Sequence, residues 1–262
     1  MRQPAHSATR RGLLISGLTA SLTAAQQPRS GKPSRILVFD VNETLLDLDA
    51  LKPHFQAIFG DAGTLRDWFN NVIQYSLVLT LAGPYKNFAE VARAALTMTA
   101  EERGRKLSEE EARRILSAIR TLPAHPDAAP NLSRLKMAGF RMVTLTNSPP
   151  ATVEAQLSSA NLQRFFERSF SVDAVQKFKP APEPYRFVAR ELGVETRALR
   201  LIAAHAWDVA GALQSGCAAA FVARPGKALF PLSSPPDIVG KNLTEIADAI
   251  LKSDSPQRSA IP

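Results

Sequence analysis

The turn Asp40-Val-Asn-Glu-Thr44 has the residue types and the spacing of a site for nucleophilic chemistry. Asp40 ends the apolar run of residues 35–39, a pattern that is typical of a buried parallel strand. A carboxylate at the end of such a strand, followed by a turn that presents backbone N–H groups, is well placed to act as a nucleophile. We therefore take Asp40 as the candidate catalytic nucleophile.

Three more short motifs follow this turn in order along the chain. They read Leu145-Thr146-Asn147, Lys179-Pro180 and Ala206-Trp207-Asp208. Together with Phe39-Asp40-Val41-Asn42-Glu43-Thr44-Leu45, they resemble the four ordered motifs of the haloacid dehalogenase superfamily. The resemblance extends from about residue 35 to residue 251 and implies a Rossmann-like α/β core with an inserted cap.

The superfamily contains phosphatases, phosphonate hydrolases and dehalogenases, so the reaction has to be argued separately. Its phosphatases usually carry a second Asp two residues after the nucleophile, as the acid for the leaving group, and two acids in the last motif for Mg²⁺. Here Asn42 takes the first position and Asp208 stands alone in the last motif. One carboxylate fewer supports the octahedral oxygen coordination of Mg²⁺ poorly. A halide departs without a proton or a metal, so the missing groups are those that dehalogenation does not need.

Further local similarity indicates the type II (S)-2-haloacid dehalogenases. The chain shares with them Pro84-Tyr85-x-x-Phe88 and a Tyr185 that follows Lys179 by six residues. The resemblance implies that Asp40 attacks the halogen-bearing carbon of a short 2-haloalkanoic acid. The resulting ester is then hydrolysed by water, and neither metal nor cofactor is needed. Lys179 would keep Asp40 ionised, because a positive neighbour lowers the pKa of a carboxylate.

The resemblance also implies roles for the other polar residues of the motifs. Thr44, Thr146 and Asn147 would hold the substrate carboxylate or the ester oxygens. Asp208 would orient the lysine or the hydrolytic water, and Tyr185 would join the hydrogen-bond network around the lysine.

Two positions depart from the family pattern. Where the insert helix normally carries an arginine that binds halide and substrate, this chain has Phe69. Arg66, one turn earlier, either substitutes for that arginine or is a solvated helix charge. His205 replaces the Asn of a family Ser-x-Asn pattern, and it is either a general base for ester hydrolysis or a hydrogen-bonded neighbour of the site. Asn42, Arg66 and Phe69 complete the candidate substrate-binding residues.

Two alternative functions stay open at this point. A Mg²⁺-dependent phosphatase for small phosphorylated metabolites would use Asp40 and Asp208 as metal ligands, because the first turn and the lysine serve both reactions. An inactive fold used as a binding module is the other alternative, which the joint presence of Asp40, Lys179 and Asp208 disfavours.

Strand and helix patterns alternate through most of the chain at the spacing of βαβ units, which predicts a doubly wound parallel sheet. The predicted strands are residues 35–40, 140–146, 199–204 and 218–223. The predicted helices between them are residues 128–138, 151–166, 183–192 and 209–215.

One segment after the first strand carries helical patterns only, at residues 51–59, 65–81, 88–98 and 109–122. Because ligands of open α/β sheets bind at the carboxyl ends of the strands, a helical insert there is a candidate lid. We therefore predict a core of residues 35–48 and 123–252, a cap of residues 49–122 and a disordered tail of residues 253–262.

The composition of the 262 residues is that of an ordinary globular protein, and its single cysteine, Cys217, excludes an internal disulfide. The net charge is +8, but residues 1–34 hold five basic residues and no acidic ones, which leaves +3 for the rest. We therefore expect a small-molecule substrate and no nucleic-acid partner. No apolar run after residue 30 is long enough to span a membrane.

The first 25 residues resemble a twin-arginine export signal. Arg10-Arg11 precede a moderately apolar stretch that ends in Ala24-Ala25, and the polar residues 26–34 are typical of a linker. We predict export, to the periplasm for example; the alternative is a basic tail or a misassigned start on a cytoplasmic protein. The apolar stretch 65–81 also permits a homodimer.

Overall fold

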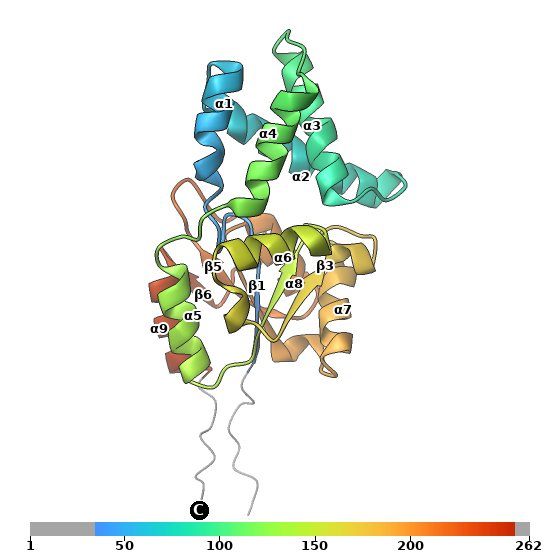
Figure 1. Cartoon of the computed structure of the whole chain (residues 1–262). Coiled ribbons are helices and arrows are strands. Elements are labelled where there is room, and N and C mark those ends of the chain that lie inside the picture. The colour runs from blue at the N-terminus through green and yellow to red at the C-terminus, as the bar shows by residue number, and fades with distance from the viewer. Residues whose placement is uncertain (1–34, 255–262) are drawn as a thin grey trace, which may run out of the picture. The chain divides into compact units, whose positions relative to one another are not determined.

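Short apolar strands build a parallel sheet of six strands in the order β3-β2-β1-β4-β5-β6. The computed structural model describes residues 35–254 (Figure 1). The strands are β1 (Ile36–Phe39), β2 (Met142–Thr146), β3 (Arg168–Ser171), β4 (Leu199–Ala203), β5 (Ala218–Val222) and β6 (Ile238–Gly240). Every residue of β1, β2 and β4 is buried, as expected of strands that helices cover on both faces.

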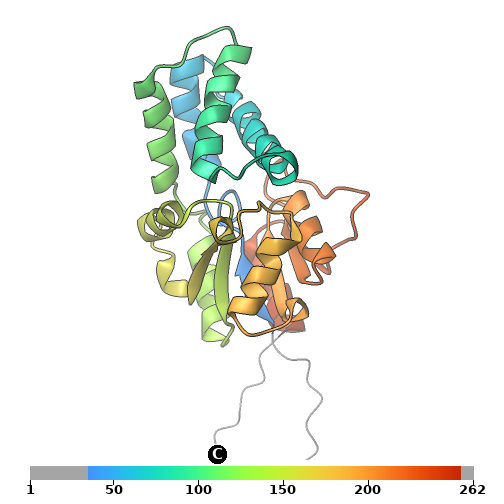
Figure 2. The same cartoon turned by 90° about the vertical axis from the view of Figure 1, so that its right-hand side faces the viewer.

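Five helices cover the two faces of this sheet. They are α5 (Ala128–Met137), α6 (Pro150–Ser159), α7 (Pro182–Glu191), α8 (Ala206–Gln214) and α9 (Leu243–Ser253). Helix α5 packs against α9 and α7 packs against α8. Figure 2 shows the orange helices α7 and α8 on the side of the sheet that faces the viewer. The strand order runs outward from β1 in both directions with parallel pairing throughout, which confirms the predicted doubly wound fold.

Two strands and several helix boundaries differ from the prediction; α8, for example, begins at Ala206 and not at residue 209. The strands β3 and β6 were not predicted, because β3 has only two buried residues and β6 is three residues long. The predicted helix 151–166 is in fact α6 followed by a 3-10 turn, Gln163–Phe165. The break comes at Asn161, whose φ of 55° lies in the left-handed region that ends helices.

Between β1 and α5 the chain forms a group of four helices (Figure 1). They are α1 (Lys52–Phe59), α2 (Thr64–Ala82), α3 (Phe88–Glu102) and α4 (Glu109–Ala118). Capping boxes begin two of them, Asn87 with Glu90 at α3 and Ser108 with Glu111 at α4. The buried Trp68 of α2 donates its indole N–H to the carbonyl oxygen of Ala92, which ties α2 to α3.

The ordered core extends two residues beyond its predicted end at residue 252. Asp254 is buried and accepts hydrogen bonds from Arg35 at 3.0 Å and from Arg200 Nε at 2.6 Å. Arg200 lies in β4 and is itself fully buried, so Asp254 compensates a charge inside the core. Residues 253 and 254 therefore do not belong to a disordered tail; the remainder of the predicted tail, 255–262, lies outside the described residues.

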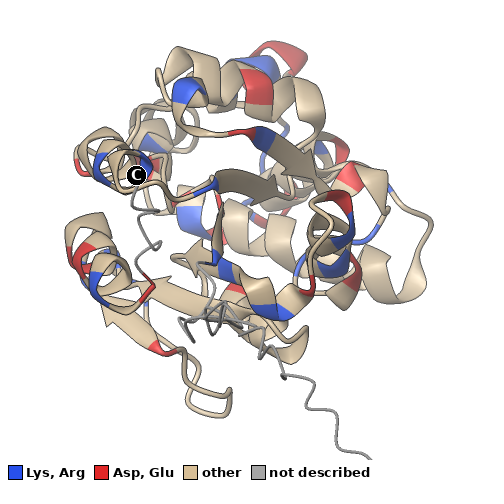
Figure 3. Cartoon of the chain, turned by 90° about the horizontal axis from the view of Figure 1, so that it is seen from below, with Lys and Arg blue, Asp and Glu red and all other residues tan. Residues whose placement is uncertain are grey.

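The predicted export signal and linker, residues 1–34, also lie outside the described residues and stay a prediction. Within residues 35–254, no helix combines the length and the apolar character that crossing a bilayer requires. Lysine and arginine are interspersed with aspartate and glutamate along the described ribbon (Figure 3).

Candidate active site

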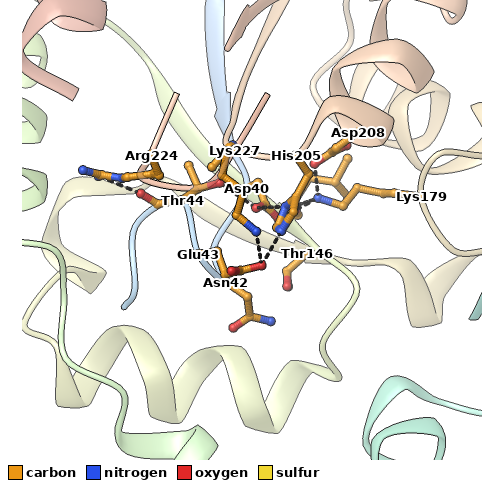
Figure 4. A network of polar contacts seen from close by, with 12 residues as sticks. Asp40, Asn42, Glu43, Thr44, Thr146, Lys179, His205, Asp208, Arg224 and Lys227 are labelled. Atoms are coloured by element: carbon orange, nitrogen blue, oxygen red, sulfur yellow. Dashed lines mark hydrogen bonds and ion pairs between the residues drawn. The ribbon is translucent and has the colours of Figure 1, made fainter. Parts of the chain in front are cut away.

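Polar side chains meet where β1, β2 and β4 end, at the carboxyl edge of the sheet (Figure 4). Asp40 directly follows β1, Thr146 ends β2 and His205 comes two residues after β4. The parallel pairing of β1 with both neighbours brings these ends side by side. This is the edge at which open α/β sheets bind their ligands.

Lys179 joins two buried carboxylates. Its ammonium donates to Asp40 Oδ1 at 2.8 Å, to Asp208 Oδ2 at 2.6 Å and to the carbonyl oxygen of Leu145 at 2.9 Å. All three ammonium protons are therefore used inside the protein. The exposed fraction of the lysine side chain is 0%, and those of Asp40 and Asp208 are 5% and 0%.

The backbone around Lys179 is fixed from two sides. Its N–H donates to Asn147 Oδ1 at 3.1 Å. On the other side, α8 packs directly on Pro180, because a Cβ at Gly211 would lie 2.5 Å from both the Cβ and the carbonyl oxygen of Pro180. Glycine at position 211 thus allows the close approach that sets Lys179 between its two carboxylates.

Burial and charge act in opposite directions on these groups. Burial would raise the pKa of Asp40, but Lys179 and His205 outweigh it and hold that pKa well below its usual range. Burial would lower the pKa of Lys179, but Asp208 and Asp40 raise it. Burial raises the pKa of Asp208 against the attraction of Lys179. Of the two carboxylates, Asp40 therefore keeps its negative charge to the lower pH, as a nucleophile must.

Thr44 and Tyr185 complete the contacts of the two carboxylates. Thr44 Oγ1 donates to Asp40 Oδ2 at 2.7 Å and accepts the N–H of Ala204 at 2.9 Å. Tyr185 donates its hydroxyl to Asp208 Oδ1 at 2.6 Å. Both oxygens of Asp208 are thus engaged, one by the lysine and one by the tyrosine. This geometry agrees with the predicted orientation of Lys179 by Asp208.

Three candidate substrate-binding residues form hydrogen bonds within the protein. Thr146 Oγ1 accepts the N–H of Ser148 at 3.1 Å, and Asn147 Oδ1 accepts that of Lys179. The amide of Asn42 donates to Ser148 Oγ at 3.2 Å and accepts from Gln156 at 3.0 Å. These contacts fix the loops at the sheet edge. The structure thus places Thr146, Asn147 and Asn42 at the site, and their predicted role in substrate binding stays a prediction.

His205 lies beside the nucleophile, and its nearest carboxylates are Asp40 and Glu43, not Asp208. Its Nδ1 is 3.3 Å from Asp40 Oδ2, and its Nε2 is 2.9 Å from Glu43 Oε2. Burial would lower the pKa of His205, but its contacts with Asp40 and Glu43 raise it. Both carboxylates, while they are ionised, therefore favour the protonated form of His205.

Glu43 and Lys227 are site residues that the sequence motifs did not predict. Lys227 Nζ lies 2.7 Å from Glu43 Oε2. Glu43 lies in the first motif, between the nucleophile and Thr44. A charged side chain at that position could have been recognised as a site residue from the sequence. Lys227 offers no comparable signal, because it follows β5 and meets Glu43 only through the fold.

Phe69 and Arg66 project from α2 towards this edge. The Phe69 ring lies against His205 with ring centroids 6.1 Å apart. His205 is therefore a titratable side chain next to Phe69, which occupies the position of the family arginine. Arg66 pairs with Glu43 Oε1 at 3.0 Å. Phe69 contributes to two cavities, one of about 440 Å³ that Asn42 also lines and one of about 490 Å³ that His205 also lines.

The donor set does not fit a magnesium site. The oxygens of Asp40 and Asp208 accept hydrogen bonds from Lys179, Thr44 and Tyr185, and the lysine ammonium already lies between the two carboxylates. Within residues 35–254, no group of three or more His, Cys, Asp or Glu side chains is arranged to hold a metal ion. This arrangement disfavours the phosphatase alternative, which needs both carboxylates as metal ligands.

Comparisons with known proteins identify the family of this chain. The family model of the haloacid dehalogenase-like hydrolases matches residues 35–216, and the chain belongs to that family. It is 34% identical over 182 residues to (S)-2-haloacid dehalogenase 1 of Pseudomonas sp. (strain CBS-3), which covers 69% of this chain and 80% of the relative. It is 27% identical over 218 residues to the (S)-2-haloacid dehalogenase of Pseudomonas fluorescens, covering 82% of this chain and 96% of that relative.

A solved structure shows the same fold. It is the L-2-haloacid dehalogenase of Xanthobacter autotrophicus with chloropropionic acid covalently bound. The TM-score is 0.77 at 26% identity, and the match covers 83% of this chain and 98% of the other. The predicted resemblance to type II 2-haloacid dehalogenases is confirmed.

Proposed function

We propose that the protein hydrolyses short 2-haloalkanoic acids to 2-hydroxy acids and halide through an ester on Asp40. The observation that carries this proposal is the buried Lys179 ammonium bound to Asp40 and Asp208 at 2.8 and 2.6 Å. It keeps a carboxylate ionised at an edge of the sheet where ligands bind. The family and its 2-haloacid dehalogenase relatives support the same reaction.

In the first step, a carboxylate oxygen of Asp40 attacks C2 of the substrate. The carbon–halogen bond breaks, and the halide leaves with the bonding electron pair, so no proton is needed. Lys179 and Thr44 hold the Asp40 carboxylate from its two oxygens and so limit its rotation. Such orientation of two reactants can lower a barrier by about 7–11 kcal/mol.

In the second step, water attacks Cγ of the Asp40 ester. The bond between Cγ and the alkyl oxygen breaks, which frees the 2-hydroxy acid and restores the Asp40 carboxylate. The attacking water must lose a proton, and we assign His205 as the base because its Nδ1 lies 3.3 Å from Asp40 Oδ2. Neither step uses a metal, since Lys179 supplies the positive charge beside Asp40.

The reaction is tested by incubating the protein with 2-chloropropionate in EDTA and measuring free chloride. We expect chloride release from the wild type and none above background from Asp40→Asn. Phosphate release from a panel of phosphoesters, with and without Mg²⁺, is expected to be absent. Phosphate release without chloride release would overturn the proposal in favour of the phosphatase.

Tyr185→Phe is expected to shift the pH dependence of dehalogenation. The change removes the hydroxyl that donates to Asp208 Oδ1 and so raises the pKa of Asp208 further. The acid limb of kcat/KM should therefore move to higher pH. A hydrogen bond to a charged group contributes about 1.5–3 kcal/mol, so we expect a loss of activity of roughly ten- to a hundredfold at neutral pH. An unchanged acid limb would show that Asp208 does not control the reaction.

A further inference from the structure

Glu43 is a buried charged residue of the site, and neither of the two reaction steps described above involves it. Only 6% of the residue is exposed, and its φ is 60°, in the left-handed region that favours glycine. Non-glycine residues persist there when surrounding contacts hold them, and such positions cluster at functional sites. A glutamate is thus kept at a position that glycine would occupy without strain.

Three basic side chains from separate segments hold the Glu43 carboxylate (Figure 4 shows two of them). Lys227 Nζ is 2.7 Å from Oε2, His205 Nε2 is 2.9 Å from Oε2, and Arg66 Nη1 is 3.0 Å from Oε1. Burial would raise the pKa of Glu43, but His205 and Lys227 outweigh it and lower the pKa to about 2. Glu43 is therefore a fixed negative charge throughout the neutral pH range.

The contact with Glu43 sets the orientation of the His205 ring. With Nε2 bound to Glu43, the other ring nitrogen, Nδ1, faces Asp40 Oδ2 at 3.3 Å and has no hydrogen-bond partner within residues 35–254. Trp207 stacks on the imidazole with centroids 4.9 Å apart at an interplanar angle of 23°. Glu43 and His205 both line the cavity of about 490 Å³, so the imidazole borders a space that water can enter.

We propose that Glu43 is a positioning residue for the hydrolysis of the Asp40 ester: it holds His205 through Nε2 so that Nδ1 takes a proton from the attacking water. This inference rests on the proposed function. It extends the role of His205 to a pair of residues: Glu43 anchors Nε2 of the imidazole, and Nδ1 faces the Asp40 carboxylate. In catalytic histidines generally, a hydrogen bond to one ring nitrogen orients the ring, and the other nitrogen transfers the proton.

The state of Asp40 then decides the charge of His205. The ionisable groups near the imidazole are Asp40 and Glu43 in direct contact, Lys227 and Arg66 behind Glu43, and Lys179, which lies 5.9 Å from the Trp207 ring. In the free enzyme two carboxylates face His205 and favour its protonated form. Esterification makes Asp40 neutral and leaves the cations in place, so His205 releases its Nδ1 proton to solvent and becomes a base.

The protons balance over the cycle. His205 Nδ1 accepts one proton from water as the hydroxide oxygen bonds to Asp40 Cγ, and it passes that proton to the departing alkoxide of the 2-hydroxy acid. The second proton of the water, on the new Asp40 carboxylic acid, moves to Nδ1 and restores the charged His205. One proton per turnover thus leaves the enzyme when the ester forms, as the overall hydrolysis of a carbon–halogen bond requires.

The test is single-turnover kinetics of Glu43→Gln with 2-chloropropionate, with the mass of the intact protein followed in time. We expect ester formation within about threefold of wild type and ester hydrolysis at least tenfold slower, so that the adduct accumulates. The acid limb of the hydrolysis rate should move to lower pH, because loss of the Glu43 charge lowers the pKa of His205. Glu43→Asp should recover part of the hydrolysis rate, and Glu154→Gln, on the exposed face of α6, should match wild type.

Wild type that forms no adduct would overturn the proposed function itself. Wild type that forms and hydrolyses the adduct, with Glu43→Gln slowing both steps equally or neither and an unchanged acid limb, would overturn only the role of Glu43. If Glu43→Gln does not fold, Glu43→Gly gives the same test, because glycine adopts a φ of 60° without strain. It should show the same separation of the two rates.

Discussion

Replacing Lys179 by methionine is expected to reduce dehalogenation of 2-chloropropionate by at least about a hundredfold. The change leaves Asp40 and Asp208 buried without the ammonium that binds both. Removal of one partner from a buried ion pair costs about 3–5 kcal/mol, because the remaining charge is uncompensated. The pKa of Asp40 then rises, which lowers the ionised fraction of the nucleophile. Chloride release at several pH values measures both effects.

The matched control for this variant is Lys252→Met, which changes an exposed lysine near the end of α9. It should retain wild-type activity and an unchanged unfolding temperature. The methionine side chain at position 179 keeps most of the buried volume, so circular dichroism should show a folded protein. A folded Lys179→Met variant with activity within threefold of wild type would contradict the role given to the lysine.

His205→Ala is expected to separate the two half-reactions. Ester formation needs no proton transfer and should change little, whereas hydrolysis loses its base and should slow by about 10²–10⁴-fold. The ester on Asp40 should therefore accumulate within the first turnover. Intact-mass detection would show it as the mass of the substrate without halide, added to the protein.

His54→Ala, on α1 of the inserted helices, is the control for loss of an imidazole that is not among the hydrogen-bond or ion-pair partners of Asp40, Lys179 or His205. It should hydrolyse the ester at the wild-type rate. Equal slowing of both steps in His205→Ala would instead identify the histidine as a structural neighbour of Asp40.

The sequence predicted those strands of the sheet that are buried along all or almost all of their length, because their residues form a continuous apolar run. Such runs mark β1, β2, β4 and β5, whereas β3 reads Arg-Ser-Phe-Ser and carries no such signal. Its place in the sheet follows from pairing with β2, a contact between distant residues. The doubly wound topology could still be predicted, because the alternation of strands and helices does not depend on finding every strand.

The residues of the site were predictable where each of them belongs to a recognisable sequence motif. Asp40, Lys179 and Asp208 stand in separate motifs, and the structure brings them into direct contact. The contacts of Glu43 were not predictable, since Arg66, His205 and Lys227 lie in three segments that only the folded chain brings together. The inward hydrogen bonds of Thr146 and Asn147 likewise depend on loop geometry that residue types do not encode.

The ester on Asp40 is tested most directly by a single turnover in H₂¹⁸O with unlabelled enzyme in excess over 2-chloropropionate. Because water attacks Cγ of Asp40, the hydroxyl oxygen of the product comes from the aspartate, and the solvent oxygen enters the carboxylate. We expect lactate without ¹⁸O and the label in the peptide that contains Asp40. Lactate that carries ¹⁸O from the first turnover, with an unlabelled Asp40 peptide, would mean that water displaces the halide directly and would contradict the account.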